Sequence, residues 1–305
     1  MNRKIYFAIA VNLLLNSKLI AQDYAMASRD SVFNSYSEAS HKKELVTLLN
    51  LREKGLQEVP KEINKFPNLK TLSLMKNDIS NLSEEFYNIT SLQEAIIRNN
   101  RISQIHPRIS QLKNLQVLTI SYNFLTSLPQ EIGTLSKLKV LHLDNNLIVE
   151  LPASMGKLDQ LEALSLNKNK LSNLPSEIGE MDKLLNLDLS DNQFEKMPIG
   201  LCNIKTLKIL NLENNYLKEL PASISELENL TTLILTRNQL KKIPSSIVKL
   251  ENLEILILSF NNLDRLPAKL KKLKKLKTLI AVGNNFSFAE RERIKKELPE
   301  VDIRF

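Results

Sequence analysis

The sequence predicts an α/β solenoid in which equal coils, each with one short strand and one return arm, stack in a single direction. A 23-residue unit recurs without insertion or deletion from Leu69 to Leu276, and an asparagine holds the same place in each unit. Inside the unit an L-x-L segment alternates as a strand does, while an L-P-x-x-I-x-x-L segment steps by three, as a short helical or extended arm does. A fixed period of this length indicates a repeat architecture.

Residues 207–229 form one complete unit, with an apolar frame of Leu207, Leu210, Leu212, Leu217, Leu220, Ile224 and Leu227. A single coil cannot bury such a frame by itself, so stability must come from stacking. Each coil then covers the leucines of the next. We expect the strands of successive coils to pair in one parallel sheet.

The asparagine of each unit stands among core leucines, and we call the ten of them the Asn ladder: Asn77, Asn100, Asn123, Asn146, Asn169, Asn192, Asn215, Asn238, Asn261 and Asn284. A carboxamide offers two donors and an acceptor, and a buried amide without partners costs about 1–3 kcal/mol. We therefore expect each amide to bind backbone groups of its own coil and of the adjacent coil, at the bend after the strand. The ladder is predicted to be structural.

This pattern resembles the leucine-rich repeat family over about residues 45–286. The 23-residue length with L-P-x-x-I is similar to the class found in Ras-pathway scaffolds and in many secreted bacterial proteins. The resemblance implies a curved solenoid with the parallel sheet on its concave face, short return arms on its convex face, and other proteins bound on the concave face. Ser83 and His106 replace the proline in the first two full units and Ala95 replaces a strand leucine, so we expect that end to be the least well packed.

Residues 1–21 have the three-part form of a secretory signal peptide. Arg3 and Lys4 precede an apolar run, and Ala21 offers a small residue for cleavage before Gln22. Polar residues interrupt the run, which is too short to span a membrane. We expect a secreted or cell-surface protein, and among proteins of the resembled class this signal-like start favours the bacterial, exported kind. The alternative is an intracellular scaffold that keeps an apolar N-terminus.

The open ends of a solenoid expose strand edges and apolar faces, so both need caps. We assign residues 22–44 to an N-terminal cap or linker and residues 287–305 to a C-terminal cap. In the latter, Ser287 and Glu290 predict a capping box that starts a helix ending near Leu298. The last apolar residues alternate and are expected to cover the final coil: Val301, Ile303 and Phe305.

The composition offers little material for catalysis. The chain has three histidines, six glycines and a single cysteine, Cys202, which excludes an internal disulfide and a cysteine-based metal cluster. We expect no enzymatic activity, no cofactor and no metal. The net charge is +8, and without residues 1–21 the chain keeps 39 basic against 34 acidic residues. This excess is too small to predict a nucleic-acid partner.

The outward strand faces divide into three zones, and the second and third form the candidate protein-binding surface. The first zone is partly basic, with Lys76 and Arg98; the middle zone is acidic and the last is apolar. Adjacent strands lie about 4.8 Å apart, so His142 and Asp188, two coils apart, are too distant to share a metal ion. The candidate binding residues are Asp144, Asp188, Asp191, Glu213, Ile234, Ile255, Ile257, Phe260, Ile280 and Val282.

Two alternatives remain for these surfaces. An exposed apolar zone marks an interface with a partner or with a second copy, unless its isoleucines only favour the strand conformation or the C-terminal segment folds over part of it. The lysines of residues 265–277, which we call the lysine cluster, either keep a leucine-rich edge solvated or bind an acidic glycan or lipopolysaccharide. The predicted function is a non-catalytic scaffold that binds another protein, a host or cell-surface one if the source is a bacterium.

Overall fold

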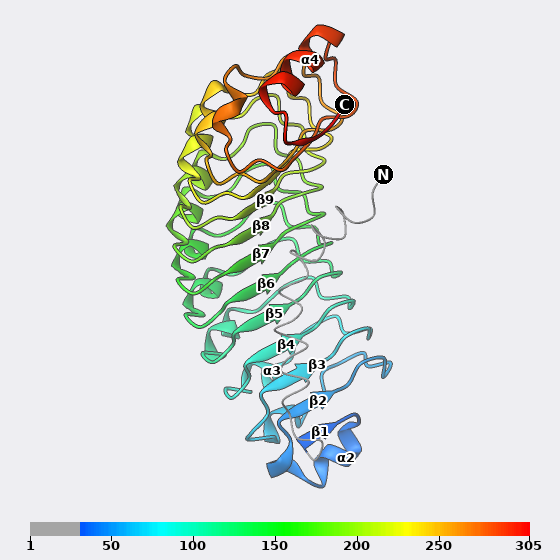
Figure 1. The fold of residues 1–305 in the computed structure, drawn as a ribbon. Coiled ribbons are helices and arrows are strands. Elements are labelled where there is room, and N and C mark those ends of the chain that lie inside the picture. Colours follow the sequence, from blue (N-terminus) through cyan, green and yellow to red (C-terminus); the bar gives the residue numbers. More distant parts are fainter. Residues whose placement is uncertain (1–30) are drawn as a thin grey trace.

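The computed structural model describes residues 31–305. Figure 1 shows one open arc of stacked coils, from the blue N-terminal end to the red C-terminal end. One parallel sheet of 13 strands follows the chain in sequence order from β1 to β13. The predicted solenoid with a parallel concave sheet is confirmed. The predicted signal peptide lies outside the described residues.

Each coil contributes one short strand to the sheet. The strands are β1 (Val32–Phe33), β2 (Leu48–Asn50), β3 (Thr71–Ser73), β4 (Glu94–Ile96), β5 (Val117–Thr119), β6 (Val140–His142), β7 (Ala163–Ser165), β8 (Asn186–Asp188), β9 (Ile209–Asn211), β10 (Thr232–Ile234), β11 (Ile255–Ile257), β12 (Thr278–Ile280) and β13 (Asp302–Arg304). The register places Leu187 beside Leu210 and Leu210 beside Leu233. The same leucine of every unit therefore stacks in one inward column, and all three are fully buried.

The return arms are mostly 3-10 turns, and residues 31–305 contain three α-helices, two of them in the end caps. The helices are α2 (Tyr36–Ser40), α3 (Glu84–Tyr87) and α4 (Phe288–Glu297). The 3-10 turns are η2 (Lys43–Leu45), η3 (Ile63–Lys65), η4 (Pro107–Gln111), η5 (Gln130–Thr134), η6 (Ala153–Lys157), η7 (Ser176–Glu180), η8 (Ile199–Asn203), η9 (Ala222–Glu226), η10 (Ser245–Lys249) and η11 (Leu270–Lys272).

The proline of the unit starts the 3-10 turn. Pro221 has φ −68° and ψ 150°, and its carbonyl accepts a hydrogen bond from Ile224 N at 3.1 Å, which directs the Ile224 side chain into the core. His106 takes the proline place in its coil and so has a backbone N–H, which donates to Tyr87 Oη at 3.1 Å. Tyr87 is buried and Ala95 is fully buried. Tyr87 thus binds the extra N–H, but a cavity of about 170 Å³ lined in part by Tyr87 and His106 remains beside it, so the expectation of looser packing at this end stays a prediction.

The Asn ladder is hydrogen-bonded in the same way from coil to coil. Asn215 Nδ2 donates to Leu212 O of its own coil at 3.2 Å and to Leu189 O of the preceding coil at 3.0 Å. Its Oδ1 accepts from Phe194 N at 3.1 Å. Asn192 Nδ2 also donates to Leu189 O, so each inner carbonyl serves two successive amides. The amides thus satisfy backbone groups that the bend leaves without strand partners.

The residue before each ladder position has a left-handed backbone, which the sequence analysis did not anticipate. Its φ lies between 53° and 71° in a set that we call the αL column: Glu53, Lys76, Asn99, Tyr122, Asn145, Lys168, Asp191, Asn214, Arg237, Phe260 and Gly283. Non-glycine residues rarely adopt this conformation, although asparagine and aspartate tolerate it better than most. The turn ends each strand and leaves the column's side chains along one edge of the concave sheet.

The C-terminal cap closes the last coil through α4 and β13. Ser287 Oγ accepts from Glu290 N at 3.2 Å, as half of a capping box. The other half is wrong, since the Glu290 carboxylate accepts from Leu266 N at 2.9 Å instead of from the Ser287 N–H. The buried Glu290 carboxylate therefore ties α4 to the preceding coil. Glu297 likewise accepts from Leu270 N at 2.7 Å.

The predicted end of the C-terminal helix is close to the observed one, because α4 ends at Glu297 and Leu298 is its C-cap. β13 then pairs with β12 and places Ile303 beside Leu279. At the other end, Phe33 of β1 is buried and Tyr36 of α2 packs edge-on against Phe66, with ring centroids 5.7 Å apart.

Candidate functional site: the concave face

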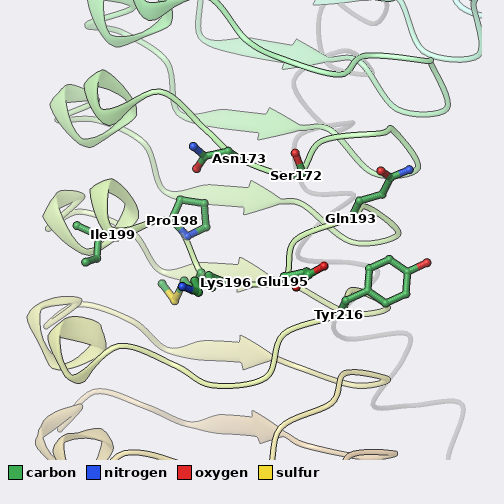
Figure 2. A pocket seen from close by; sticks show the side chains of 9 residues that line it. Ser172, Asn173, Gln193, Glu195, Lys196, Pro198, Ile199 and Tyr216 are labelled. Carbon is green, nitrogen blue, oxygen red and sulfur yellow. The ribbon is translucent and has the colours of Figure 1, made fainter.

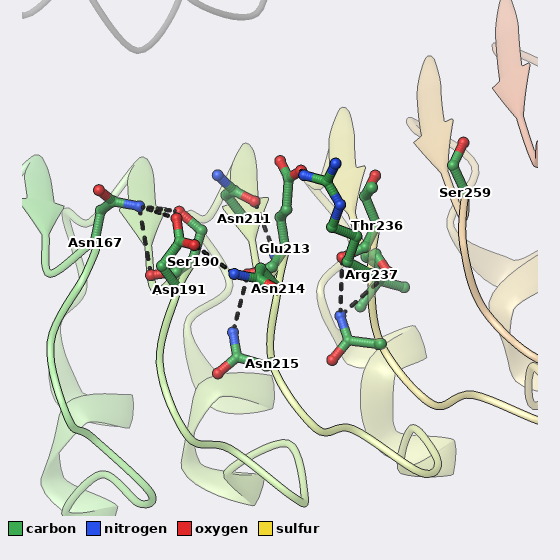
Figure 3. A network of polar contacts seen from close by, with 12 residues as sticks. Asn167, Ser190, Asp191, Asn211, Glu213, Asn214, Asn215, Thr236, Arg237 and Ser259 are labelled. Atoms are coloured by element: carbon green, nitrogen blue, oxygen red, sulfur yellow. Dashed lines mark hydrogen bonds and ion pairs between the residues drawn. The ribbon is translucent and has the colours of Figure 1, made fainter.

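The middle of the concave face carries a hydrogen-bonded network of polar side chains. Asn167 Nδ2 donates to Ser190 Oγ at 2.7 Å and to Asp191 Oδ2 at 3.0 Å, as Figure 3 shows. Asp191 Oδ1 accepts from Asn214 Nδ2 at 2.5 Å. Ser190 N and Ser190 Oγ both donate to Asp188 Oδ1, at 2.9 and 2.5 Å. These five residues, two of them in the αL column, are thereby fixed relative to one another across three coils.

Asp144 lies further toward the N-terminal end, where it accepts hydrogen bonds from two serines. Ser121 Oγ donates to Asp144 Oδ2 at 3.0 Å, and Ser165 Oγ donates to Asp144 Oδ1. The two serines belong to the preceding and the following coil. Toward the other end, Glu213 and Arg237 form a loose ion pair, with 3.7 Å between Arg237 Nη1 and Glu213 Oε1. The acidic residues are therefore brought into one zone, as the sequence predicted, although most already have partners.

Burial among the strands raises the pKa values of two carboxyl groups in the acidic zone. Burial raises the pKa of Asp188 to about 6, against a lowering by the hydrogen bonds from Ser190, and the Asp144 charge raises it further. The pKa of Glu213 is also raised, first by burial and then by Asp191 and Asp188, while Arg237 lowers it. Part of the negative charge of this zone therefore depends on pH in the range just below neutrality.

His142 lies on the same face, at the end of β6. Burial lowers its pKa, Asp144 acts in the opposite direction and Arg98 lowers it further. His142 is therefore a neutral side chain at pH 7. Within residues 31–305 there is no group of histidine, cysteine and carboxylate side chains arranged to hold a metal ion.

The apolar zone is less exposed than the sequence analysis expected. Ile234 and Ile257 are buried, and with the half-buried Ile255 and Ile280 they form a separate core on the concave side, which we call the isoleucine cluster. The reason is the close spacing of the strands, because Ile257 stands directly between Ile234 and Ile280 in the register. The prediction of an exposed isoleucine patch is wrong for Ile234 and Ile257.

On the concave side, two exposed aromatic side chains lie instead at the sheet edge. Phe260 of the αL column is 52% exposed and Tyr122 of the same column is 41% exposed. The guanidinium of an arginine from the preceding coil covers each ring, Arg98 at 4.6 Å from the Tyr122 centroid and Arg237 at 5.8 Å from the Phe260 centroid. The sequence analysis named Phe260 as a candidate but did not distinguish its exposure from that of the isoleucines.

A second apolar cluster on the concave side was missed. It consists of Val117, Val140 and Ala163, the first residues of β5, β6 and β7, and all three are buried. The sequence signal was available, because these residues stand two places before the residue inside each L-x-L segment and so share its face. Of the residues at this place in the coils, the sequence analysis named only Ile255 as a candidate.

An open groove of about 680 Å³ lies on the flank that joins the strands to the 3-10 turns. Figure 2 shows its lining side chains, which come from three successive coils: Ser172, Asn173, Gln193, Glu195, Lys196, Met197, Pro198, Ile199 and Tyr216. Lys218 pairs with Glu195 at 2.7 Å on the same flank. The groove is separate from the residues predicted to bind a partner.

The lysine cluster lies on and beside η11, away from the strands. Lys269, Lys271, Lys272 and Lys274 are exposed, whereas Lys277 pairs with Glu254 at 2.7 Å. The leucines between the lysines are buried. Within the described part of the chain no helix is long and apolar enough to cross a membrane.

Comparison with known proteins identifies the family. A family model described as a leucine-rich repeat region matches residues 95–189 and 187–302, which is well over half of the chain. The chain belongs to the leucine-rich repeat family. Leucine-rich repeat proteins commonly serve as protein-interaction scaffolds and are typically not enzymes. No curated protein matches this leucine-rich repeat protein in a sequence search.

Several solved structures share the fold of this leucine-rich repeat protein. A leucine-rich repeat protein of Leptospira interrogans is 27% identical with a TM-score of 0.73, and the match covers 90% of this chain and 99% of that one. A TDR receptor is 26% identical with a TM-score of 0.72, covering 84% of this chain and 46% of the receptor. The plant peptide hormone receptor RGFR1, solved in complex with RGF2, is 26% identical with a TM-score of 0.60, covering 85% and 50%. The chain thus spans about half the length of both receptors.

Proposed function

We propose that this leucine-rich repeat protein is a secreted or surface-exposed, non-catalytic scaffold that binds a partner protein on its concave face. The observation that supports the proposal best is the fixed arrangement of polar side chains across the coils, such as Asn167, Asp191 and Asn214. Side chains held in place before binding lose less conformational entropy when a partner docks. The RGFR1 structure, with RGF2 bound, supports a peptide- or protein-binding role for a related solenoid.

Cross-linking from two faces of one coil tests the binding surface. A photo-reactive amino acid replaces Asn214, which is exposed at the concave edge, or Ala222, which is exposed on η9 of the same coil. Each variant of residues 22–305 is irradiated with isolated cell-surface proteins. We expect a cross-linked product from position 214 that an excess of unlabelled chain prevents. A product only from position 222 contradicts the concave face as the binding surface.

Secretion is proposed from the N-terminal sequence and is tested separately. N-terminal sequencing of the protein isolated from its native cells is expected to begin at Gln22. An intact Met1 would instead support the intracellular scaffold. The binding proposal is independent of this result, since it rests on residues 31–305 alone.

A second candidate function concerns the lysine cluster. Lys269, Lys271, Lys272 and Lys274 are exposed, and no acidic side chain pairs with them among the described residues. Such a surface is suited to an acidic glycan or lipopolysaccharide. Binding of heparin or lipopolysaccharide should then fall steeply with added salt and with Lys271→Glu. Binding that is unchanged by both rules out this role for the cluster.

A further inference from the structure

Phe260 stands at the C-terminal end of the concave face, where the αL column presents an aromatic ring to solvent. The position requires a left-handed backbone in every coil, and polar or small residues would meet that requirement without exposing apolar surface. Phe260 is nevertheless 52% exposed with φ 55°. An exposed ring at a rigid sheet edge resembles the anchor residues of protein interfaces, which are enriched in aromatic side chains and arginine.

The ring is held from both sides. On one side the Arg237 guanidinium lies 5.8 Å from the ring centroid. On the other side is Gly283, where a Cβ atom would stand 2.6 Å from Phe260 Cδ1. Gly283 is the αL-column residue of the next coil, and the ten residues before it in this column all have side chains. The glycine therefore makes room for the ring, which is preorganised in its exposed position.

The ring continues an apolar floor. Phe260 N donates to Val282 O at 2.7 Å, which brings the residue beside the end of β12. Val282 is half-buried, and so are Ile255 and Ile280 of the isoleucine cluster. Val282, Ile280 and the ring can together cover one bulky apolar side chain of a partner, whereas Ile255 starts β11, five residues before Phe260, and is too distant along the strand to share it. The middle of the face, by contrast, is occupied by the polar network around Asp191.

Arg237 adds a charge beside this floor. Its side chain is 62% exposed, and its ion pair with Glu213 is loose at 3.7 Å. A guanidinium has five N–H donors, so most of its donors face solvent. Glu213 belongs to the coil before Arg237 and Phe260 to the coil after it, so a second carboxylate can approach from the Phe260 side. Arginine beside an aromatic ring suits a carboxylate flanked by an apolar group.

We propose that this place binds an exposed segment of a different protein in which a bulky apolar side chain stands next to a carboxylate. The apolar side chain packs on Phe260, Val282 and Ile280, and the carboxylate binds Arg237. The inference rests on the proposed function, because it assumes that the concave face binds proteins, and it names the anchor and the partner's chemistry.

The test uses short linear peptides as the probe. A random peptide library is selected on immobilised residues 22–305, and the recovered peptides are synthesised for affinity measurement by fluorescence anisotropy. We expect them to combine an aromatic or large aliphatic residue with Asp or Glu. Phe260→Ala should weaken their binding at least about tenfold, as for an interface anchor. Arg237→Ala should weaken them several-fold, and this loss should vanish for peptides whose carboxylate is replaced by an amide.

Tyr122→Ala is the matched control. Tyr122 shares the αL column, is 41% exposed and is covered by Arg98, but Asn145 follows it in the column and the isoleucine cluster lies five to seven coils away. Its loss should leave the peptide affinity unchanged. Thermal melts of both variants check folding, and since each ring is largely exposed we expect melting temperatures close to that of the wild type.

Four results would overturn the inference. In the first, the recovered peptides bind Phe260→Ala as tightly as wild type; in the second, they are basic and their binding depends on Asp144 or Asp188. In the third, no peptide is recovered. In the fourth, the protein is a homodimer in solution that Phe260→Asp dissociates. The second result moves the site to the acidic zone and the fourth makes a second copy the occupant. Cross-linking from position 214 would still support the proposed function in the first three cases.

Discussion

Replacement of Asn215 by alanine removes one rung of the Asn ladder from the centre of the solenoid. Asn215 is 4% exposed, so water cannot substitute for the lost amide. Phe194 N loses its acceptor, Asn215 Oδ1 at 3.1 Å, and is left unpaired. The two inner carbonyls keep one amide each, because Asn192 still donates to Leu189 O and Asn238 to Leu212 O.

The loss of stability can be estimated from these lost hydrogen bonds. One buried N–H without a partner costs about 1–3 kcal/mol, and each lost but partly compensated hydrogen bond costs about 0.5–1.5 kcal/mol. With one unpaired N–H and two partly compensated hydrogen bonds, we expect Asn215→Ala to lower the free energy of unfolding by about 2–6 kcal/mol. A urea titration followed by circular dichroism measures this change, with the slope of the transition compared between variants.

Two further variants make this measurement specific. Asn262 follows a ladder residue directly, but its side chain is exposed, so Asn262→Ala should change the free energy of unfolding by less than about 0.5 kcal/mol. Asn284, the last rung, is half-buried, and Ala281 O accepts from it without a following amide. Its replacement should cost less than that of Asn215. A loss below about 1 kcal/mol for Asn215→Ala, or equal losses at Asn215 and Asn262, would refute the structural role of the ladder.

Three other substitutions have expected outcomes. The pKa of Asp188 is raised to about 6 from 3.8 by burial, so this carboxyl makes the wild type less stable as the pH rises from about 4 to 6. Asp188→Asn should therefore gain stability relative to wild type as the pH rises, by on the order of 1–3 kcal/mol in the free energy of unfolding at pH 7. Melting temperatures of both proteins across this range measure the change, and a constant difference would contradict the raised pKa. The pKa of Glu290 is lowered, first by its hydrogen bond with Arg293, so its stabilisation is present above pH 4.5 and lost as the pH falls through the folded-state pKa. Glu290→Gln should speed hydrogen exchange in the C-terminal cap at pH 7 but differ little from wild type in acid, and equal exchange at pH 7 would disprove this role. Gly283→Ala places a Cβ on a backbone with φ 71° and against Phe260. It should therefore destabilise the protein by about 1 kcal/mol or more and alter the NMR chemical shifts of the Phe260 ring. Unchanged shifts would show that the ring does not need the glycine.

Much of the fold could be predicted because the relevant information is repeated in the chain. The L-x-L alternation placed the inward columns of leucines such as Leu210, and the amide chemistry of Asn215 required backbone partners at the bend. The structure has both. A unit that occurs once gives a weak pattern, whereas the same unit in register over the whole sheet leaves few other arrangements.

The exposure of the candidate site was harder to predict. Ile257 reads as an outward-facing residue from its strand, yet it is 5% exposed, because Ile234 and Ile280 flank it at the spacing of neighbouring strands. Phe260 was grouped with these isoleucines although it alone is strongly exposed. The difference depends on the left-handed backbone of the αL column, whose sequence signals are the asparagines at positions such as Asn145 and Asn214 and the glycine at Gly283.

The sequence by itself determined the coil length, the direction of stacking and the inward columns, because a 23-residue period of leucines and asparagines can be buried only when each unit covers its neighbour. The tertiary structure alone decided which side chains reach solvent and which groups share a hydrogen bond. Glu290 shows the limit most clearly: its spacing from Ser287 predicts a bond within the helix, but its carboxylate binds Leu266 N. That N–H lies 24 residues earlier in the chain, and only the folded stack brings the helix beside it.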